Sequence, residues 1–512
     1  MSRTRRIVGG VGLGQVHLVL VTIVGLFLTP FLLHRVGQQE YGLWLLGLQL
    51  TGYLALLDFG VVGLLPREVS FAKGRVIAGE PATLLRDTVS RVRGVIRWQL
   101  PLVALASLAA WWLLPATWAG LRAPLAWVMA FFVVTFSTRA LHATLQGLQD
   151  LVFLGQVQVA SWSAGTAIMV GLVLNGQRLG ALATGWLVMQ SVTTVACWWR
   201  IRSRFRHVWA PTISWASWAD ARLYFAKSVW VSTSQIAQVL LGGSDVLLIG
   251  AVLGPAAVVP YACTAKLIQV LANHPQMLMQ AASPALSEMR MSESREKLIS
   301  ATFVLTRAML VISGGVAVTV IAINGPFVQW WVGPQQYGGL ALTLLLVAGM
   351  LVRHLNTTTS YAVFSFGHER RLALTALADG AVTVIASVVL LRFMGAAGAA
   401  VGGLVGVLSI SLIANFVALG RELGLPVLAP LKDLGGWFVR FVVAATASIL
   451  LATWHPTPGV WQVLVRGAIA SLVYVGVMWS FVLHGPLGAY LRPILRQPLS
   501  AAPTAAPDAN AA

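Results

Sequence analysis

Residues 299–322 read ISATFVLTRAMLVISGGVAVTVIA, and Arg307 is the single charged side chain in this stretch. An α-helix needs about 20 mostly apolar residues to cross the hydrocarbon core of a bilayer. The stretch therefore predicts a membrane-spanning helix. The chain around it has the same character: 57% of its 512 residues are hydrophobic and only 10% are charged, whereas about a quarter of the residues of a soluble domain are charged.

Similar apolar runs, separated by short polar stretches, continue on both sides of this one. We predict an all-α polytopic membrane protein with about fourteen spanning helices. The expected spans are 10–33, 42–66, 97–115, 124–145, 154–174, 179–199, 225–251, 256–281, 299–322, 338–362, 372–392, 396–419, 435–454 and 462–484.

The positive charges predict the orientation of these helices. The chain has 35 Lys and Arg against 16 Asp and Glu, and the bases gather in alternate loops such as 67–97, 200–206 and 290–297. Such a bias marks the cytoplasmic side of a membrane protein, so both termini should be cytoplasmic. Because this pattern and contacts with anionic lipids explain the basic charge, we do not expect a nucleic-acid partner.

An internal repeat divides the expected helices into two groups. Residues 111–120 read WWLLPATWAG and residues 330–339 read WWVGPQQYGG, an offset of 219. Gly37 and Gly254 occupy matching turns at an offset of 217. Chance similarity between Trp-rich interfaces and Gly-rich turns is the alternative explanation.

The repeat predicts two six-helix lobes of the same orientation, a layout that some transporters use to hold substrate between lobes. The expected lobes are 1–207 and 208–424. Helices 13 and 14 follow within 425–490, and 491–512 should form a disordered cytoplasmic tail, because it is rich in Ala and Pro.

Several short motifs resemble a known family. They are VGQQEYGLW at 36–44, LLDFG at 56–60, SDVLLIG at 244–250, LGP at 253–255 and PALS at 284–287. In order and spacing they resemble the polysaccharide and O-antigen flippases of the multidrug/oligosaccharidyl-lipid/polysaccharide exporter superfamily. The resemblance covers roughly residues 8–420.

The resemblance implies a function in polysaccharide or lipopolysaccharide biosynthesis. Members of this family are thought to flip undecaprenyl-pyrophosphate-linked oligosaccharides, such as O-antigen or exopolysaccharide repeat units, across the bacterial inner membrane by alternating access. The implied partners are the lipid-linked oligosaccharide, membrane lipids, and the polymerase and glycosyltransferases of the same pathway. A cation-coupled small-molecule or drug antiporter of the same superfamily is the main alternative.

Ionisable residues within the spans are the first candidates for the site, because burying charge in a membrane is expensive. Arg139 and Arg353 have similar neighbours in helices 4 and 10. A guanidinium can bind two phosphate oxygens at once, so we expect this pair to hold the pyrophosphate. The alternative is that both snorkel to the membrane interface.

Two further pairs combine opposite or titratable groups. Asp245 and Lys266 should lie at similar depth in helices 7 and 8, either as a structural ion pair or as one that opens when phosphate arrives. Asp58 and His274 match at an offset of 216 and would couple proton movement to transport if they meet across the cavity. The alternative is that Asp58 bonds to backbone in its own lobe.

The remaining candidates are less specific. Arg307 is a candidate cavity residue, and Arg35 is a candidate for an outer gate. Gln15 in helix 1 and Gln235 in helix 7 belong to polar stretches that either line the cavity or join helices.

The sequence predicts no enzyme, cofactor or metal site. It contains neither a G-x-x-x-x-G-K-[S/T] phosphate loop nor an H-E-x-x-H helix, and its two cysteines lie in apolar runs. A membrane glycosyltransferase or polymerase would need long loops with clustered acids, whereas the longest loops here are basic.

Overall fold

The computed structural model describes residues 3–209, 215–427, 434–454 and 459–488. These ranges fold into helices and contain no β-strand. The predicted tail at 491–512 lies outside the described residues. The long helices are α1 (Arg3–Arg35), α2 (Gln38–Ala55), α3 (Val61–Ile77), α4 (Thr83–Trp112), α5 (Arg122–Thr135), α6 (Arg139–Gly147), α7 (Leu151–Leu174), α8 (Leu179–Arg204), α9 (Trp218–Val252), α10 (Pro255–Ser292), α11 (Arg295–Val332), α12 (Gly339–Ser365), α13 (Glu369–Met394), α14 (Ala397–Gly406), α15 (Leu412–Leu423), α17 (Gly435–Thr453) and α18 (Val460–His484).

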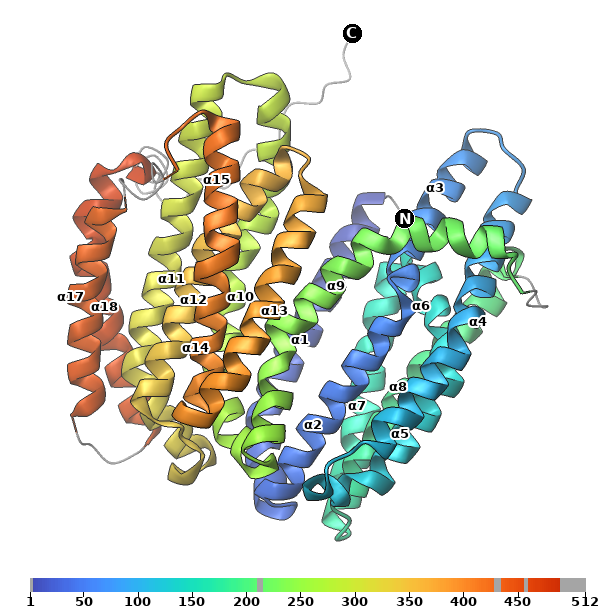
Figure 1. The fold of residues 1–512 in the computed structure, drawn as a ribbon, viewed down its shortest axis with the longest axis horizontal. Helices are drawn as coiled ribbons and strands as arrows, with labels where there is room; N and C mark the ends of the chain where they lie inside the picture. Colours follow the sequence, from blue (N-terminus) through green and yellow to red (C-terminus); the bar gives the residue numbers. More distant parts are fainter. Residues whose placement is uncertain (1–2, 210–214, 428–433, 455–458, 489–512) are drawn as a thin grey trace. The chain divides into compact units, whose positions relative to one another are not determined.

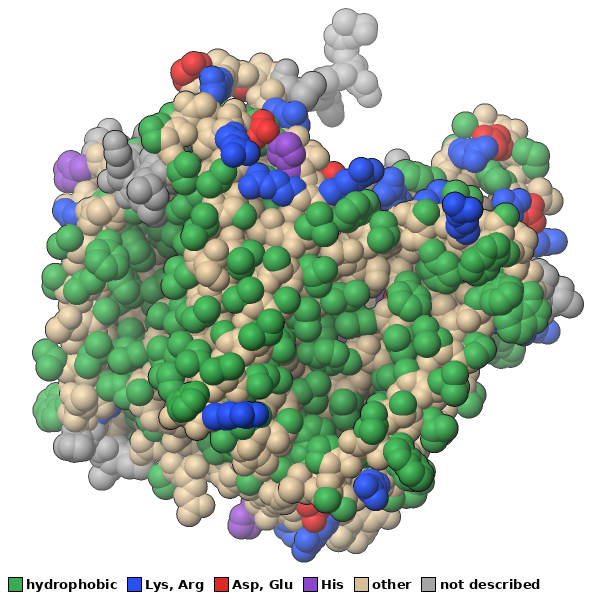
Figure 2. All heavy atoms as spheres, viewed as in Figure 1, with side chains coloured by type: hydrophobic (Ala, Val, Ile, Leu, Met, Phe, Trp, Pro, Cys, Tyr) green, Lys and Arg blue, Asp and Glu red, His purple; other side chains and the backbone are tan. Residues whose placement is uncertain are grey.

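The predicted all-α membrane fold is confirmed. By length and apolar composition, the described residues form 13 helices able to cross a membrane, and a bent pair of helices makes the count 14. Each predicted run overlaps one of these spans. On the face shown in Figure 2, hydrophobic side chains cover the middle of the helices and most Lys and Arg side chains gather near the helix ends. This distribution suits a chain that passes repeatedly through a bilayer.

The structure differs from the expected spans in two places. The run predicted as one helix at 42–66 is broken by 51° between Asp58 and Val61. The expected loop at 67–97 is largely helical, because α3 continues to Ile77 and α4 starts at Thr83. Arginine, which is frequent in this stretch, is a good helix former. The helices therefore continue past the apolar core, where hydropathy gives no signal.

The aligned turns of the repeat share a backbone geometry. Gly37 and Gly254 each precede a helix with a positive φ, of 96° and 92° respectively. Such angles favour glycine, because a side chain would clash with the backbone. The two Trp-rich segments also match, since in each the Trp-Trp pair is followed by a 3-10 helix, η2 (Ala116–Leu121) or η5 (Pro334–Gln336).

The chain forms two compact units, and the predicted lobe boundary near residue 207 stays a prediction. Unit 1 contains residues 1–266, 328–345 and 369–411. In it α7 packs against α8 and α1, α3 packs against α6, and α13 packs against α9 and α14 (Figure 1). Because α2 and α3 also contact α9, the helices of the first half of the chain and α9 pack in the same unit.

Unit 2 contains residues 267–327, 346–368 and 412–512. Its core joins α17 and α18 to α11 through Trp437, Tyr474 and Leu310. The Tyr474 hydroxyl donates a hydrogen bond of 2.6 Å to the Val311 carbonyl of α11. The last two helices therefore pack on α11 within this unit.

Candidate functional site

A pocket of about 830 Å³ lies within unit 1. Its volume falls in the range of about 300–1,000 Å³ that is usual for small-molecule sites. Six long helices and two 3-10 helices, η1 (Leu56–Asp58) and η3 (Phe136–Thr138), contribute to its wall. The lining residues are Leu48, Thr51, Gly52, Ala55, Asp58, Val62, Gly63, Pro66, Arg67, Phe132, Thr135, Thr138, Arg139, His142, Ala143, Gln146, Trp186, Gln190, Thr193, Thr194, Cys197 and Gln235.

The break in the second span brings a carboxylate to this pocket. Asp58 ends η1, and the next two residues have the left-handed φ values of 47° at Phe59 and 73° at Gly60. The Gly60 N–H donates a hydrogen bond of 2.8 Å to Asp58 Oδ1. Gln99 of α4 donates a bond of 2.8 Å to the Asp58 carbonyl. The bend thus holds Asp58 by both its side chain and its backbone.

The left-handed φ of Gly60 favours glycine at the break. The close approach of α9 also requires a glycine here. A Cβ at this position would lie 2.7 Å from the Ser232 nitrogen and 2.9 Å from the Ser228 oxygen of α9. Real Cβ atoms do not approach backbone so closely. The motif Leu56–Gly60 therefore allows the second span to bend while its corner lies directly against α9.

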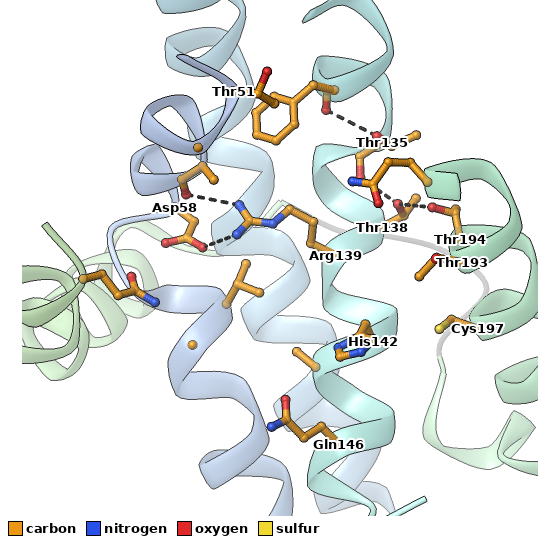
Figure 3. Close-up of a pocket in the computed structure, with 18 of the residues that line it drawn as sticks. Thr51, Asp58, Thr135, Thr138, Arg139, His142, Gln146, Thr193, Thr194 and Cys197 are labelled. Atoms are coloured by element: carbon orange, nitrogen blue, oxygen red, sulfur yellow. Dashed lines mark hydrogen bonds and ion pairs between the residues drawn. The ribbon is translucent and has the colours of Figure 1, made fainter. Parts of the chain in front are cut away.

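Arg139, the first residue of α6, binds Asp58. Its Nη2 lies 3.1 Å from Asp58 Oδ2, and its Nη1 donates a bond of 3.2 Å to the Ala55 carbonyl. Figure 3 shows the guanidinium reaching from α6 across to η1. The Asp58 side chain is 2% exposed, whereas that of Arg139 is 32% exposed. The buried acid is therefore neutralised by a base that still faces the pocket.

These contacts use two of the five N–H groups of a guanidinium. The bond to the carboxylate runs through one nitrogen and not through the two-pronged contact that Arg can make with a carboxylate. A ligand with several anionic oxygens can therefore compete with Asp58 for Arg139.

Neutral polar groups cover the wall opposite Asp58 (Figure 3). Thr138 and Thr194 approach with their hydroxyl oxygens 3.5 Å apart. Thr135 and Thr193 donate to carbonyls one turn back in their own helices, so their oxygens remain acceptors toward the pocket. Such a wall suits a ligand rich in hydroxyl groups.

Contacts within unit 1 hold the predicted outer ends of the helices together. Gln38 donates a hydrogen bond of 2.8 Å to the Ala256 carbonyl and accepts one of 2.9 Å from Gln336. Trp118 donates a bond of 3.2 Å to the Gly250 carbonyl. The turns that the repeat aligns are therefore joined to one another at this end.

The structure brings three of the predicted site residues together, because Asp58, Arg139 and Gln235 all line the pocket. Asp58 does bond to backbone in its own half, as the alternative held, and it also binds Arg139. Its approach to His274, an exposed residue of α10 in unit 2, stays a prediction.

The other candidates lie elsewhere in the described chain. Asp245 of α9 accepts a hydrogen bond of 2.5 Å from the Tyr261 hydroxyl, and its pairing with Lys266, half-buried in α10, stays a prediction. Arg35 is exposed at the end of α1. The side chain of Gln15 lies outside the described residues.

Two candidate arginines belong to unit 2. Arg307 of α11 lies over the Phe481 ring of α18, 5.6 Å from its centre, and Arg353 is half-buried in α12. Their roles in a cavity stay predictions.

Sequence reasoning missed most of the polar wall. Trp186, Gln190, Thr193, Thr194 and Cys197 recur at spacings of three or four along α8. This spacing places them on one helix face. A search for polar stripes within apolar runs would have found them, whereas a search for charges could not.

Comparisons with known proteins agree with this architecture. Residues 108–338 match the family model described as "Polysaccharide biosynthesis protein". Among the curated proteins, no sequence matches the chain. The fold is similar to that of the lipid II flippase MurJ in an inward closed conformation, with 12% identity, 94% of this chain and 99% of that chain covered, and a TM-score of 0.66.

A second solved structure shares the fold less closely. It is an outward-facing multidrug resistance MATE family transporter of the MOP superfamily, with 14% identity, 83% of this chain and 94% of that chain covered, and a TM-score of 0.50. At such identities the likeness is one of fold. Together with the match over 108–338 it agrees with the resemblance that the motifs indicated: the chain is a multi-pass membrane protein, part of it matches a polysaccharide biosynthesis family, and its fold is similar to that of the lipid II flippase structure.

Proposed function

We propose that this protein flips an undecaprenyl-pyrophosphate-linked oligosaccharide, such as an O-antigen or exopolysaccharide repeat unit, across the bacterial inner membrane by alternating access. It would act as a transporter and not as an enzyme, with both termini in the cytoplasm. The related fold and the polysaccharide family match support this class of substrate.

The observation that carries the proposal is Arg139 on the wall of a large polar pocket, held by a buried Asp58. A pyrophosphate presents several anionic oxygens in place of one carboxylate, so it can take over Arg139 through a two-pronged contact. The released Asp58 would be a buried, unpaired charge, which is costly. Uptake of a proton by Asp58 removes that charge and would couple proton movement to substrate binding.

The rest of the pocket suits the sugar. Thr138, Thr194 and Gln190 offer hydroxyl and amide groups, and Trp186 offers an aromatic face. Sugars combine hydroxyl edges with apolar ring faces, so a wall of this kind binds both. Arg67 adds a second cation at the α3 side.

Alternating access requires one end of the helices to open. The bonds from Gln38 to Ala256 and from Trp118 to Gly250 join the predicted outer ends. We propose that these bonds break when the pocket turns toward the outer face. Arg353, Lys266 and Arg307 would meet the substrate along the way, and Asp245, His274 and Arg35 would act in coupling or gating.

The test uses the purified full chain in proteoliposomes that contain a fluorescent undecaprenyl-pyrophosphate oligosaccharide in both leaflets. Quenching from outside reports the rate of flipping. Arg139→Gln should slow flipping by about 100-fold, since losing a charged hydrogen bond removes about 3 kcal/mol. Arg200→Gln removes an arginine outside the pocket and serves as the matched control.

Two results would argue against the proposal. An unchanged flipping rate in Arg139→Gln would mean that the substrate does not pass through this pocket. Movement of a cationic dye driven by a proton gradient, with no movement of the lipid-linked sugar, would instead identify a drug antiporter.

A further inference from the structure

A second pocket, of about 710 Å³, lies in unit 1 beside the first. Arg86 and Arg93 of α4, Arg202 of α8, and Arg206 and His207 of η4 (Arg206–Val208) line it. Its described lining residues include no Asp or Glu. Several like charges around one space repel one another. An anion in the pocket would relieve this repulsion.

The pocket is built and not a chance gathering of surface arginines. Arg93 is 6% exposed, and its guanidinium carbon lies 3.6 Å from the centre of the Trp209 ring. Arg86 donates a hydrogen bond of 3.2 Å from Nε to the His207 carbonyl. Both arginines of α4 thus hold the segment after α8 in position, and this segment carries further cations into the pocket.

The basic groups are combined with apolar ones. Leu141 and Ile201 line the pocket and are 2% and 1% exposed. Trp198 also lines it and is 48% exposed, as expected for a tryptophan at a membrane interface. A free phosphate ion would gain nothing from these surfaces, whereas the glycerol and upper acyl carbons of a lipid would.

We propose that this basic pocket binds the phosphate headgroup of an anionic membrane phospholipid. Basic pockets between helices on the cytoplasmic side of membrane proteins recognise such headgroups, and the predicted topology puts the end of α8 on that side. The guanidinium groups contact the phosphate, and the exposed Trp198 contacts the carbon chain below it. The site shares Thr138 with the Asp58–Arg139 pocket but takes a structural lipid in place of the transported one.

The experiment measures lipid binding to the purified full chain in detergent by native mass spectrometry, without transport. The probes are phosphatidylglycerol, zwitterionic phosphatidylethanolamine and undecaprenyl pyrophosphate. Arg202→Gln/Arg206→Gln removes two exposed cations of the pocket. The matched control, Arg204→Gln/Arg222→Gln, removes two exposed arginines that do not line it.

We expect phosphatidylglycerol to bind the pocket variant about 30-fold more weakly, because each basic residue near a lipid surface contributes roughly a fivefold factor and the variant removes two. The control should change by no more than about threefold, and phosphatidylethanolamine should bind weakly throughout. An equal loss of phosphatidylglycerol affinity in the pocket variant and the control variant would overturn the proposal. It would also fail if phosphatidylethanolamine bound as tightly, or if only undecaprenyl pyrophosphate depended on Arg202 and Arg206.

This outcome is independent of the flipping assay. An effect of Arg139→Gln on transport does not require the lipid site, and loss of phosphatidylglycerol binding does not require transport. Failure of one proposal therefore leaves the other open to its own test.

Discussion

Two arginine–aspartate pairs in unit 1 differ in geometry. Arg200 of α8 contacts Asp150 through two hydrogen bonds, of 2.7 and 3.1 Å, and both side chains are about equally buried, at 20% and 17% exposure. Arg139 contacts Asp58 through one nitrogen, and the acid is far more buried than the base. The first pair makes the two-pronged contact that an arginine and a carboxylate can form, whereas the second holds a base that faces a pocket.

The difference between a two-pronged and a one-pronged contact indicates different roles for the two arginine–aspartate pairs. A two-pronged pair fixes two helices and leaves little for a ligand to gain. A one-pronged pair at a pocket wall can exchange its carboxylate for a stronger anion. We therefore expect the Asp150–Arg200 pair to act in stability alone and the Asp58–Arg139 pair to act in both stability and binding.

The largest expected effect tests this separation directly. Arg139→Gln should lower the stability of the protein by about 3–5 kcal/mol, because it leaves Asp58 charged and buried. Adding Asp58→Asn should restore most of the melting temperature in detergent but none of the flipping rate. The corresponding double variant of Asp150 and Arg200 should recover the melting temperature and flip at the rate of the unchanged protein. Recovery of flipping in Asp58→Asn/Arg139→Gln would mean that the Asp58–Arg139 pair, like the Asp150–Arg200 pair, acts in stability alone.

The backbone break that presents Asp58 gives the next effect. Gly60→Ala should destabilise by about 2–4 kcal/mol, since it combines an unfavourable φ with a clash against α9. Gly176→Ala is the matched control, because Gly176 has a φ of 84° and open space around it. It should show only the conformational part, about 1–2 kcal/mol. Equal melting temperatures in the two variants would mean that the contact with α9 is unimportant.

A conservative change sharpens the comparison further. Arg139→Lys keeps the charge but cannot grip two oxygens, so undecaprenyl pyrophosphate should bind about tenfold more weakly. Undecaprenyl monophosphate offers fewer anionic oxygens, so its affinity should fall less in this variant. Arg200→Lys should leave both affinities unchanged. The same loss for both ligands in Arg139→Lys would indicate that Arg139 acts as a simple point charge.

The smallest effect concerns the neutral wall. Thr194→Val should raise the KM for the oligosaccharide lipid about two- to fivefold, as expected for one hydrogen bond of about 0.5–1 kcal/mol. Thr446→Val on α17 is the control, because Thr446 is exposed and lies outside the pocket. Equal KM values for Thr194→Val and Thr446→Val would show that Thr194 does not contact the sugar.

The sequence predicts the fold well because hydropathy directly reports the long apolar runs. It does not predict the corner at Asp58, since a run from 42 to 66 looks continuous when only hydrophobicity is counted. The remaining sequence signal is local: an acid, Asp58, followed two residues later by a glycine, Gly60. That pattern depends on the tertiary contact with α9, which hydropathy does not register.

The candidate site is only partly predictable for a related reason. Asp58, Arg139 and Gln235 could be selected because charge and amide groups stand out in apolar helices. Their meeting could not be predicted, because Arg139 bonds Asp58 outside the offset of the repeat. The threonines of α8 were missed because each can satisfy its hydroxyl within its own helix, so none is conspicuous alone.

The length of α2 places the corner at a definite depth. The helix has 18 residues, which at 1.5 Å each is about 27 Å, close to the hydrocarbon thickness of about 30 Å. With Gly37 at the outer face, as the charge pattern predicts, we expect the corner at Asp58, and Arg139 with it, to lie near the inner side of the hydrocarbon core. A lipid diphosphate would meet its first cation while still hydrated. Dehydration of its charge would begin only after capture, so recognition and the main energetic barrier would be separated in space.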